Sequence, residues 1–582
     1  MSRKIINYLK QLRDEEHGTQ SFQKGLRNSV AFVYPNVYHV GMSNLGMHII
    51  YQIINNRGDS ACERFFLPEK EQLREHIKTG TPLLSIENQR PLTDFPIIFV
   101  MWSFEMDYDN LLTILELGNI KLQAAQRDSR ASLLIIGGPC ATFNPEPLAE
   151  VADAFVIGEG EEVVQRILDL LYSGKDRQAL LGELACVEGV YVPSLYEPVY
   201  DDAQNFVGML PAAGAPSVIR RQWVRDIDAY PHRSSIVTPR TEFEDMYLVE
   251  VARGCGRHCR FCMAGYCFRK PRPRALKNII EDIAARPKSA KKVGLMGAAV
   301  SDYPQIKELT EYLIREKIPF SVASLRADTL DKQMTDALAG SGQRTMTVAP
   351  EAGSKKMRRS INKGIEEEHI YTAVELAAAS GMRNIKLYYM IGLPGEEDED
   401  ITEMTAMVER IRTKMDACGN RGELVISVNA FVPKPFTPYQ WEPLCSVKTL
   451  KKRFKMLQEA FKRQKRIKLI TESLRETVLQ AVIAKGDRRV GRILLEAHTC
   501  GDTLKSVFRK YDIDVEALAE RALAPGSKLP WQHLDMGFSE TYLAAELERS
   551  RELKYTPPCF DGCTRCRVCA AAESKTYDMQ RS

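Results

Sequence analysis

Three cysteines lie close together in the stretch Arg253-Gly-Cys255-Gly-Arg-His-Cys259-Arg-Phe-Cys262. It carries three thiols at the spacing CxxxCxxC, directly after the apolar run 247–252, which has the pattern of a buried strand. A loop of this length can place three sulfurs around one face of a four-iron cluster and leave the fourth iron open to a ligand. On spacing alone, the alternative is a zinc site completed by His258 or Cys267.

Composition places the chain among globular proteins of several domains. It has 582 residues, a hydrophobic fraction of 44% and a formal net charge of +4. No run approaches the roughly 18 apolar residues of a membrane span, and the N-terminal residues do not have the pattern of a secretory signal. We therefore expect a cytoplasmic protein with no membrane association. In that compartment, the 14 cysteines indicate metal or redox chemistry rather than disulfides.

The alternation of strand-like and helix-like segments along the chain predicts its domains. Short apolar runs alternate with amphipathic stretches over 28–200 and again over 246–440, which predicts two α/β domains, the first doubly wound. The remaining segments are a helical lead at 1–27, a linker at 201–245, a basic and mainly helical region at 441–550, and a cysteine-rich tail at 551–582. The glycines at 137–138 and 158–160 follow two strands, where such sheets bind ligands; otherwise they only form tight turns.

The cysteine motif, with the aromatic Phe261 before the last cysteine, resembles the signature of the radical S-adenosylmethionine (radical SAM) superfamily. The strands after it resemble that superfamily's partial (β/α)6 barrel. The resemblance implies that Cys255, Cys259 and Cys262 hold a catalytic [4Fe–4S] cluster whose open iron binds SAM. One electron, from a donor of flavodoxin or ferredoxin type, would cleave SAM to methionine and a 5′-deoxyadenosyl radical.

The same resemblance assigns SAM contacts to the ends of later strands. Gly297 stands where the family has a Gly-Gly-Glu-like strand end, here without the glutamate. Ser324 and Arg326 would approach polar groups of SAM, and Glu351 would meet its ribose or amine.

A later glycine-rich turn, Ile391-Gly-Leu-Pro-Gly395-Glu396, would lie near the adenine of SAM. Otherwise it only opens a helix, with Glu396 at the favourable end of the helix dipole. Asn429-Ala-Phe431-Val-Pro-Lys-Pro435 resembles the last strand of methylthiotransferase-like members.

Over nearly its whole length, the chain resembles an uncharacterised family of cobalamin-domain-like radical SAM proteins. The matching stretches are 41–46, 137–147, 158–162 and 433–438. The resemblance implies a cobalamin-binding-like domain at 28–200, although the usual Asp-x-His-x-x-Gly motif is altered to Asn36-Val-Tyr-His39-Val-Gly41. His39 could reach a metal, but an ordinary loop histidine is the favoured interpretation.

Residues 448–468 carry ten Lys or Arg and one acidic residue, with apolar positions at helical spacing. They predict a basic amphipathic helix, which could bind RNA phosphates or could be an ordinary solvated surface helix. A role at a membrane surface is less favoured, because no aromatic anchor accompanies the basic face.

The tail places Cys559, Cys563, Cys566 and Cys569 within eleven residues. Four thiols at this density predict a metal site, either a second iron–sulfur cluster or a zinc ion with four sulfur ligands.

Our leading hypothesis is a radical SAM enzyme, a cobalamin-dependent methyltransferase if cobalamin binds, acting on a large substrate such as RNA or the ribosome. The alternatives are a methylthiotransferase-type enzyme, with the tail as a sulfur-supplying cluster, and a non-catalytic iron–sulfur scaffold that binds RNA.

Overall fold

A computed structural model describes residues 1–242, 244–560 and 562–569. The chain begins with helix α1 (Arg3–Asp14), which is followed by a parallel sheet. The strands of this sheet are β1 (Asn28–Val37), β2 (Ser60–Leu67), β3 (Ile97–Met101), β4 (Leu133–Gly137), β5 (Ala154–Val156) and β6 (Val190–Tyr191). Their order is β2-β1-β3-β4-β5-β6, and β6 alone runs antiparallel to its neighbour.

These strands form a doubly wound sheet because their residues are apolar on both faces. In β1 the six residues from Val30 to Pro35 are all buried, as expected of a strand covered on both sides by helices. The covering helices include α3 (Leu45–Asn56), α5 (Tyr108–Leu117) and α7 (Val163–Leu171). The predicted doubly wound α/β fold is confirmed.

The second α/β unit is an open barrel of parallel strands. A three-stranded sheet holds β10 (Met246–Glu250), β13 (Lys292–Met296) and β14 (Phe320–Val322). A four-stranded sheet holds β15 (Thr345–Glu351), β16 (Asn384–Ile391), β17 (Leu424–Ala430) and β18 (Ile467–Thr471). A single parallel bridge between Leu325 and Val348 joins the two sheets.

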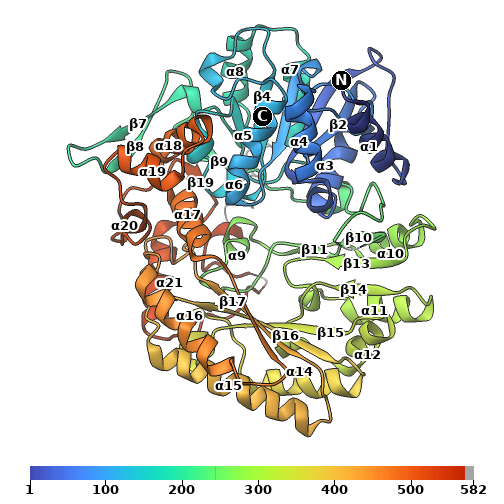
Figure 1. The fold of residues 1–582 in the computed structure, drawn as a ribbon, viewed down its shortest axis with the longest axis vertical. Coiled ribbons are helices and arrows are strands. Elements are labelled where there is room, and N and C mark those ends of the chain that lie inside the picture. The colour runs from blue at the N-terminus through green and yellow to red at the C-terminus, as the bar shows by residue number, and fades with distance from the viewer. Residues whose placement is uncertain (243, 561, 570–582) are drawn as a thin grey trace.

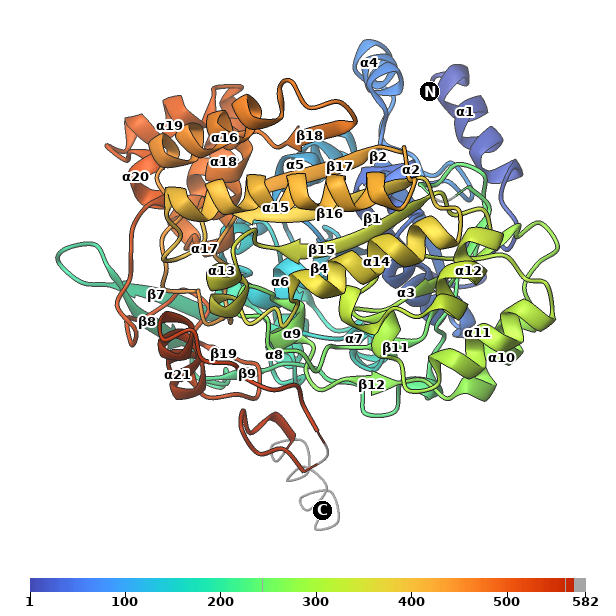
Figure 2. The same cartoon turned by 90° about the horizontal axis from the view of Figure 1, so that it is seen from below.

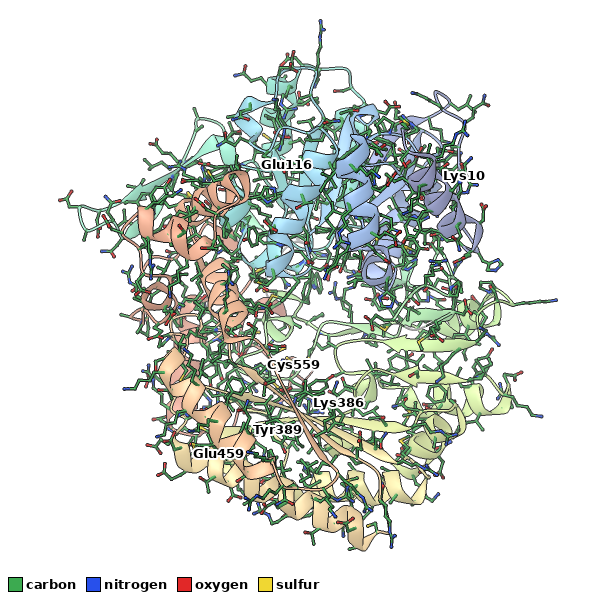
Figure 3. The ribbon with its side chains drawn as sticks, in the orientation of Figure 1. Lys10, Glu116, Lys386, Tyr389, Glu459 and Cys559 are labelled. Atoms are coloured by element: carbon green, nitrogen blue, oxygen red, sulfur yellow. The ribbon has the colours of Figure 1, made fainter. Side chains whose placement is uncertain are left out.

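Helices cover the outer side of this barrel: α10 (Leu276–Ala284), α11 (Ile306–Arg315), α12 (Lys332–Gly340), α14 (Glu367–Ala379), α15 (Asp398–Ala417) and α16 (Val447–Phe461). Residues alternate along β16, so that Tyr389 is buried on the helix side while Lys386 is half-buried on the other face (Figure 3). The N-terminal sheet lies across the barrel (Figure 1).

The structure corrects the extent of the predicted basic helix. Helix α16 ends at Phe461, and residues 467–471 form β18, which pairs with β17 from Leu424↔Ile467 onward. The alternating sequence Ile467-Lys-Leu-Ile-Thr471 suits a strand, and its long-range pairing prevails over the helical periodicity of the residues before it. In the described residues the barrel therefore has seven strands, where six were expected.

Residues 201–220, at the start of the expected linker, form part of two small sheets. Strands β7 (Tyr196–Tyr200) and β8 (Phe206–Pro211) make a hairpin, and β9 (Ile219–Arg220) pairs with β19 (Leu534–Asp535).

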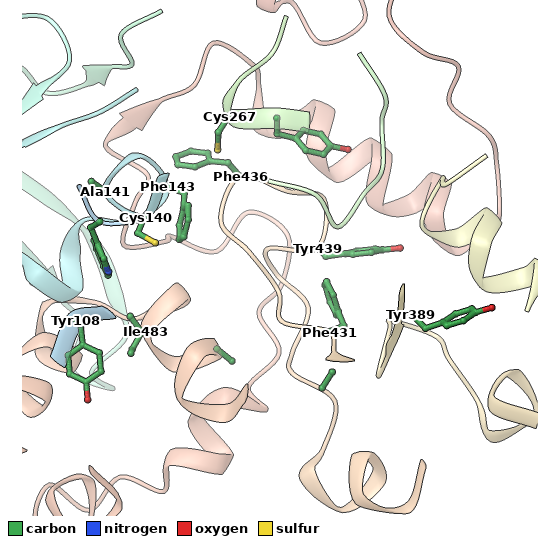
Figure 4. Close-up of a cluster of buried hydrophobic side chains, with 14 of the residues drawn as sticks. Tyr108, Cys140, Ala141, Phe143, Cys267, Tyr389, Phe431, Phe436, Tyr439 and Ile483 are labelled. Carbon is green, nitrogen blue, oxygen red and sulfur yellow. The ribbon is translucent and has the colours of Figure 1, made fainter. Parts of the chain in front are cut away.

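The N-terminal sheet, the barrel and the C-terminal helices share one buried core (Figure 4). Phe143 of helix α6 (Pro139–Phe143) belongs to the same apolar cluster as Phe436 and as Ile483 of α17 (Leu474–Lys485). This continuous core fixes the N-terminal sheet over the open end of the barrel.

Candidate active site

A cavity of about 590 Å³ lies between the N-terminal sheet and the barrel. Its N-terminal wall includes Gly46, Met101 and Gly160, and its barrel wall includes Arg253 and Gly297. Most of the surface that lines it is apolar, so it suits a ligand with a large hydrophobic body.

The position of the cavity follows from the strand order. In a sheet ordered 2-1-3-4-5, ligands bind at the carboxyl ends of the strands, where the order reverses between β1 and β3. The cavity is lined by residues 43–46, which lie beyond β1, and by Met101 and Ser103 at the end of β3. It also includes residues 137–139 and 158–161, which follow β4 and β5.

Two glycines permit the close packing of this wall. Gly138 has φ +102°, and a Cβ atom there would lie 2.7 Å from the carbonyl oxygen of Trp102. Gly158 also has φ +102°, and its Cβ would lie 2.2 Å from the carbonyl oxygen of Gln222. Only glycine fits such contacts without displacing backbone, so these strand ends approach their neighbours more closely than other residues would allow.

His39 does not line the cavity. It lies on the short helix α2 (Tyr38–Gly41), is half-exposed, and has its Nδ1 atom 3.6 Å from a carboxylate oxygen of Glu242. This agrees with the interpretation of His39 as an ordinary loop histidine.

The three motif cysteines lie on the loop that follows β10, close to one another. Burial and the neighbouring Cys259 and Cys255 raise the pKa of Cys262 to about 12. Burial also raises the pKa of Cys255. Without a bound cation, the thiols of Cys255 and Cys262 would stay protonated at neutral pH. A cationic iron–sulfur cluster is the type of group that would stabilise them as thiolates.

The described residues contain no group of three or more His, Cys, Asp or Glu side chains placed to hold a single metal ion. His258 in particular faces away from a shared site with the motif cysteines, since its Nδ1 lies 2.6 Å from the hydroxyl of Tyr542 and its Nε2 lies 3.6 Å from Sγ of Cys559. Cys267 is buried on helix α9 (Ala264–Cys267), where burial raises the pKa of its thiol to about 12. The side chain of His258 is therefore already engaged by Tyr542 and by the cysteine-rich tail.

Ion pairs hold the cysteine loop at its start and within it. Arg253 contacts Glu250 in the barrel and Glu161 in the N-terminal domain, the latter at 2.5 Å. Inside the loop, Arg257 donates two hydrogen bonds of 2.8 Å to Asp302. Each contact pairs a guanidinium with carboxylate oxygens in a partly desolvated place, which is the strong form of this interaction.

Two of the predicted SAM contacts, Arg326 and Glu351, are brought together by a residue that the sequence did not single out, Lys363. Its ammonium lies 3.1 Å from Glu351, and Arg326 donates to its backbone carbonyl at 3.2 Å. Lys363 also lies close enough to Cys259 for that thiol to raise the pKa of the ammonium group, although burial opposes the effect. No local pattern in Asn362-Lys363-Gly364 marks this lysine, because its partners come from other strands.

Glu351 adopts a strained backbone conformation with φ +69°, at an irregularity in the pairing of β15 with β16. Strain of this kind at a non-glycine residue persists only where the surrounding structure holds it, and it is concentrated at functional sites. The irregularity sets the direction of the Glu351 side chain at the end of the strand.

The other predicted contacts are more dispersed. Gly297 lines the cavity, Ser324 is exposed, and Phe261 packs against the core. Ile391 is fully buried and Gly395 is exposed with φ +75°. Glu396 accepts hydrogen bonds from the Gly392 amide and from Arg453 of α16, so it stabilises its own turn. No hydrogen bond or ion pair among the described residues joins Ile391, Gly395 or Glu396 to Glu351 or Lys363.

The four tail cysteines lie within the described residues, while the rest of the predicted tail, residues 570–582, lies outside them. Within the described ranges, every helix is too short or too polar to traverse a lipid bilayer.

Fold and site together define an α/β enzyme in which a doubly wound domain covers a parallel barrel with a three-cysteine loop. Residues 46–193 match the family described as radical SAM proteins, N-terminal, and residues 249–408 match the radical SAM superfamily. The chain belongs to the radical SAM superfamily, whose members use a [4Fe–4S] cluster and SAM.

Among curated proteins, an uncharacterised protein of Methanocaldococcus jannaschii is 28% identical over 475 residues, which are 80% of this chain and 90% of that protein. A tRNA-2-methylthio-N(6)-dimethylallyladenosine synthase of Natranaerobius thermophilus is 24% identical over 179 residues, 28% of this chain and 39% of that enzyme. Among solved structures, the radical SAM methyltransferase TsrM from Kitasatospora setae, with cobalamin and a [4Fe–4S] cluster bound, matches with a TM-score of 0.45 and 16% identity over 71% of this chain and 76% of that chain.

Proposed function

We propose that this radical SAM enzyme methylates a large substrate such as RNA, with Cys255, Cys259 and Cys262 holding its [4Fe–4S] cluster and the interdomain cavity holding cobalamin. One observation carries the proposal: a single apolar cavity is lined both by the ligand-binding end of a doubly wound sheet and by Arg253 and Gly297 beside the cysteine loop. When bound, the cluster with SAM would supply a 5′-deoxyadenosyl radical and cobalamin a methyl group for transfer to carbon.

The residues around Lys363 suit the binding of SAM. A buried ammonium beside a carboxylate offers one group to the carboxylate of an amino acid and one to an amine or hydroxyl. Lys363 and Glu351 would take these two roles, while Arg326 holds the backbone carbonyl of Lys363 in place. Because Lys363 also lies near Cys259, SAM bound there would sit next to the cluster.

The cavity residues suit a large, flat and mostly apolar ligand. Gly46 and Gly160 form part of one wall, and Met296 and Phe268 line the cavity from the barrel side. Since His39 points to Glu242 instead, the cavity would bind cobalamin without a histidine ligand to the cobalt.

Exposed cations at the barrel edge support a nucleic-acid substrate. Lys462, Arg463, Lys465, Arg466 and Lys468 are all exposed between the end of α16 and the edge strand β18. Such a patch neutralises phosphates and makes binding depend on salt. The similarity to the tRNA-2-methylthio-N(6)-dimethylallyladenosine synthase of Natranaerobius thermophilus also supports RNA as the substrate class.

Two cations of the basic helix predicted at 448–468 already have acidic partners and are less suited to binding RNA phosphates. Arg453 is buried against Glu396, and Lys452 pairs with Asp398. The patch is therefore centred on residues 462–468, and reversing the charge of Arg463, Lys465 and Arg466 together should lower the salt dependence of RNA binding by about 2 in its logarithmic slope. Reversal of Lys277, Lys288 and Lys307, which are exposed near or on α10 and α11, is the matched control. Equal loss of RNA binding in both variants would contradict an RNA site at 462–468.

The decisive experiment for the methyltransferase proposal measures cobalt and SAM products in one preparation. The protein is reconstituted anaerobically with iron and sulfide, supplied with hydroxocobalamin and desalted. We expect about one cobalt per chain, and, with a reductant, SAM and substrate, both 5′-deoxyadenosine and S-adenosylhomocysteine. The Cys255→Ala/Cys259→Ala/Cys262→Ala variant should keep the cobalt and form neither product. Absence of retained cobalt in the wild-type protein would overturn the cobalamin part of the proposal.

A further inference from the structure

The cysteine-rich tail packs directly against the loop that carries the three motif cysteines. The backbone amide of Cys559 donates a hydrogen bond of 2.8 Å to the carbonyl of Gly256, which lies between Cys255 and Cys259 in sequence. Asn362 ties the two segments together, because its side-chain amide donates to the carbonyls of both His258 and Thr556. Figure 2 shows the described tail beyond helix α21 (Glu540–Arg551).

The four tail thiols lie close to one another and are mostly removed from water. Cys563 is 7% exposed and Cys566 is 3% exposed. Burial raises the pKa of the Cys559 thiol, and the neighbouring Cys566, Cys563 and Cys569 raise it further. None of them forms a disulfide. Four cysteine sulfurs gathered in this way form the ligand set that an iron–sulfur cluster or a metal ion takes.

The buried guanidinium of Arg269 lies near the four tail cysteines. Among the described residues, no carboxylate forms a hydrogen bond or ion pair with it. Arg269 is 1% exposed, and its Nη atoms contact the Nδ1 of His258 at 3.0 Å, the hydroxyl of Tyr542 at 3.3 Å and the carbonyl of Arg257 at 3.1 Å. Its Nε atom has no hydrogen-bond partner. A buried charge without a counter-charge is costly, so Arg269 would be stabilised by an anionic group beside it.

The tail thiols are the nearest source of that negative charge. Cys559 and Cys566 are close enough to Arg269 that ionised thiols there would raise the pKa of the guanidinium. A second cation, Arg565, lies 3.3 Å from the Nε2 atom of His258. Four thiolates bound to an iron–sulfur cluster carry a net negative charge, which would compensate both guanidinium groups.

The tail contacts the loop of the expected SAM cluster, and at that place an iron–sulfur cluster can exchange an electron, whereas zinc has no redox chemistry. A [4Fe–4S] cluster accepts four cysteines around a larger body.

We propose that Cys559, Cys563, Cys566 and Cys569 bind an auxiliary [4Fe–4S] cluster that passes electrons to the SAM cluster across the Cys559–Gly256 and Cys559–His258 contacts. This relay rests on the proposed cluster at Cys255, Cys259 and Cys262. A reduced flavodoxin or ferredoxin gives one electron to the auxiliary cluster, which is reduced. The electron then moves to the SAM cluster and the auxiliary cluster is oxidised again, with no bond made or broken.

Iron content tests the site independently of activity. The reconstituted wild-type protein should contain about eight irons per chain, and Cys563→Ser/Cys566→Ser about four. The Cys255→Ala/Cys259→Ala/Cys262→Ala variant should also retain about four, with an electron paramagnetic resonance signal that SAM does not change. The matched control, Cys186→Ser/Cys418→Ser, alters two exposed cysteines and should keep about eight. About four irons in the wild-type protein, or one tightly bound zinc, would overturn the site.

Reduction kinetics test the relay. With a reduced flavodoxin system, Cys563→Ser/Cys566→Ser should form 5′-deoxyadenosine at least about tenfold more slowly than the wild-type protein, while with dithionite the two rates should agree within about twofold. Equal rates with flavodoxin would overturn the relay. If the wild-type protein holds about eight irons but forms no 5′-deoxyadenosine with either reductant, the proposed function fails and the auxiliary site stands.

Discussion

Arg253, two residues before the first motif cysteine, forms an ion pair of 2.5 Å with Glu161 of the N-terminal domain. The side chains are 13% and 6% exposed, and the same guanidinium contacts Glu250 of the barrel. Both Arg253 and Glu161 line the interdomain cavity. The ion pair therefore connects a loop of the doubly wound sheet directly to the loop that carries the cysteines.

Replacing Arg253 by Gln should loosen both loops. The substitution leaves Glu161 and Glu250 without their cation in a poorly solvated place, a change that costs about 3–5 kcal/mol in other buried pairs. We expect a lower unfolding temperature and faster hydrogen exchange over residues 158–162 and 253–262. Lys4→Gln, which removes an exposed ion pair with Glu71, should leave both readouts unchanged. Exchange at 158–162 that matches the wild-type protein would show that Arg253 does not couple the loops.

Replacing Lys363 by Met should weaken SAM binding while the iron content stays the same. Loss of one charge-assisted hydrogen bond costs about 1.5–3 kcal/mol, which corresponds to an increase of about tenfold to a hundredfold in the KM for SAM. Lys355→Met is the control, because Lys355 is exposed and pairs with Glu366. An unchanged KM would remove Lys363 from the SAM site.

Filling the cavity from its N-terminal wall should exclude cobalamin. A Cβ atom on Gly160 would already lie 3.1 Å from Cδ1 of Ile50, so the Leu side chain of Gly160→Leu would crowd this wall. A side chain on this wall takes up space that the ligand would fill, so we expect cobalamin affinity to fall by about tenfold or more, equivalent to about 1.4 kcal/mol or more, read as retained cobalt per chain. Gly182→Leu, on a helix surface with no atom within 4 Å of its Cβ position, should retain cobalt normally. Full retention by Gly160→Leu would place cobalamin elsewhere.

His533 should make the fold sensitive to acid. It lies against Tyr191, with ring centroids 4.7 Å apart, and burial together with the charge of Arg488 lowers its pKa to about 3. Between about pH 6.5 and 3, the unfolded chain binds a proton at His533 that the folded chain does not. The free energy of unfolding therefore falls by about 1.4 kcal/mol for each unit by which the pH is lowered. His533→Gln should remove this part of the slope in denaturant unfolding between pH 6.5 and 5. A variant with the full wild-type slope would show that His533 titrates normally.

Features that depend on neighbouring residues in the chain could be predicted from the sequence. The spacing CxxxCxxC, with Phe261 before Cys262, indicated the superfamily. Continuous apolar runs such as that in β1 predicted buried parallel strands, because a strand covered on both faces needs apolar residues at every position. The doubly wound domain and the enzyme class followed from these local patterns.

Features that depend on contacts between distant segments were decided by the tertiary structure. Helix α16 ends at Phe461 because β18 pairs with β17, and the helical periodicity of 448–461 gives no sign of that pairing. Lys363 reaches Glu351 only because a loop folds back to the end of β15. The contact of Cys559 with Gly256 joins positions about three hundred residues apart, and no spacing rule connects them. The sequence thus determined which residues carry the chemistry, and the long-range packing decided which of them meet.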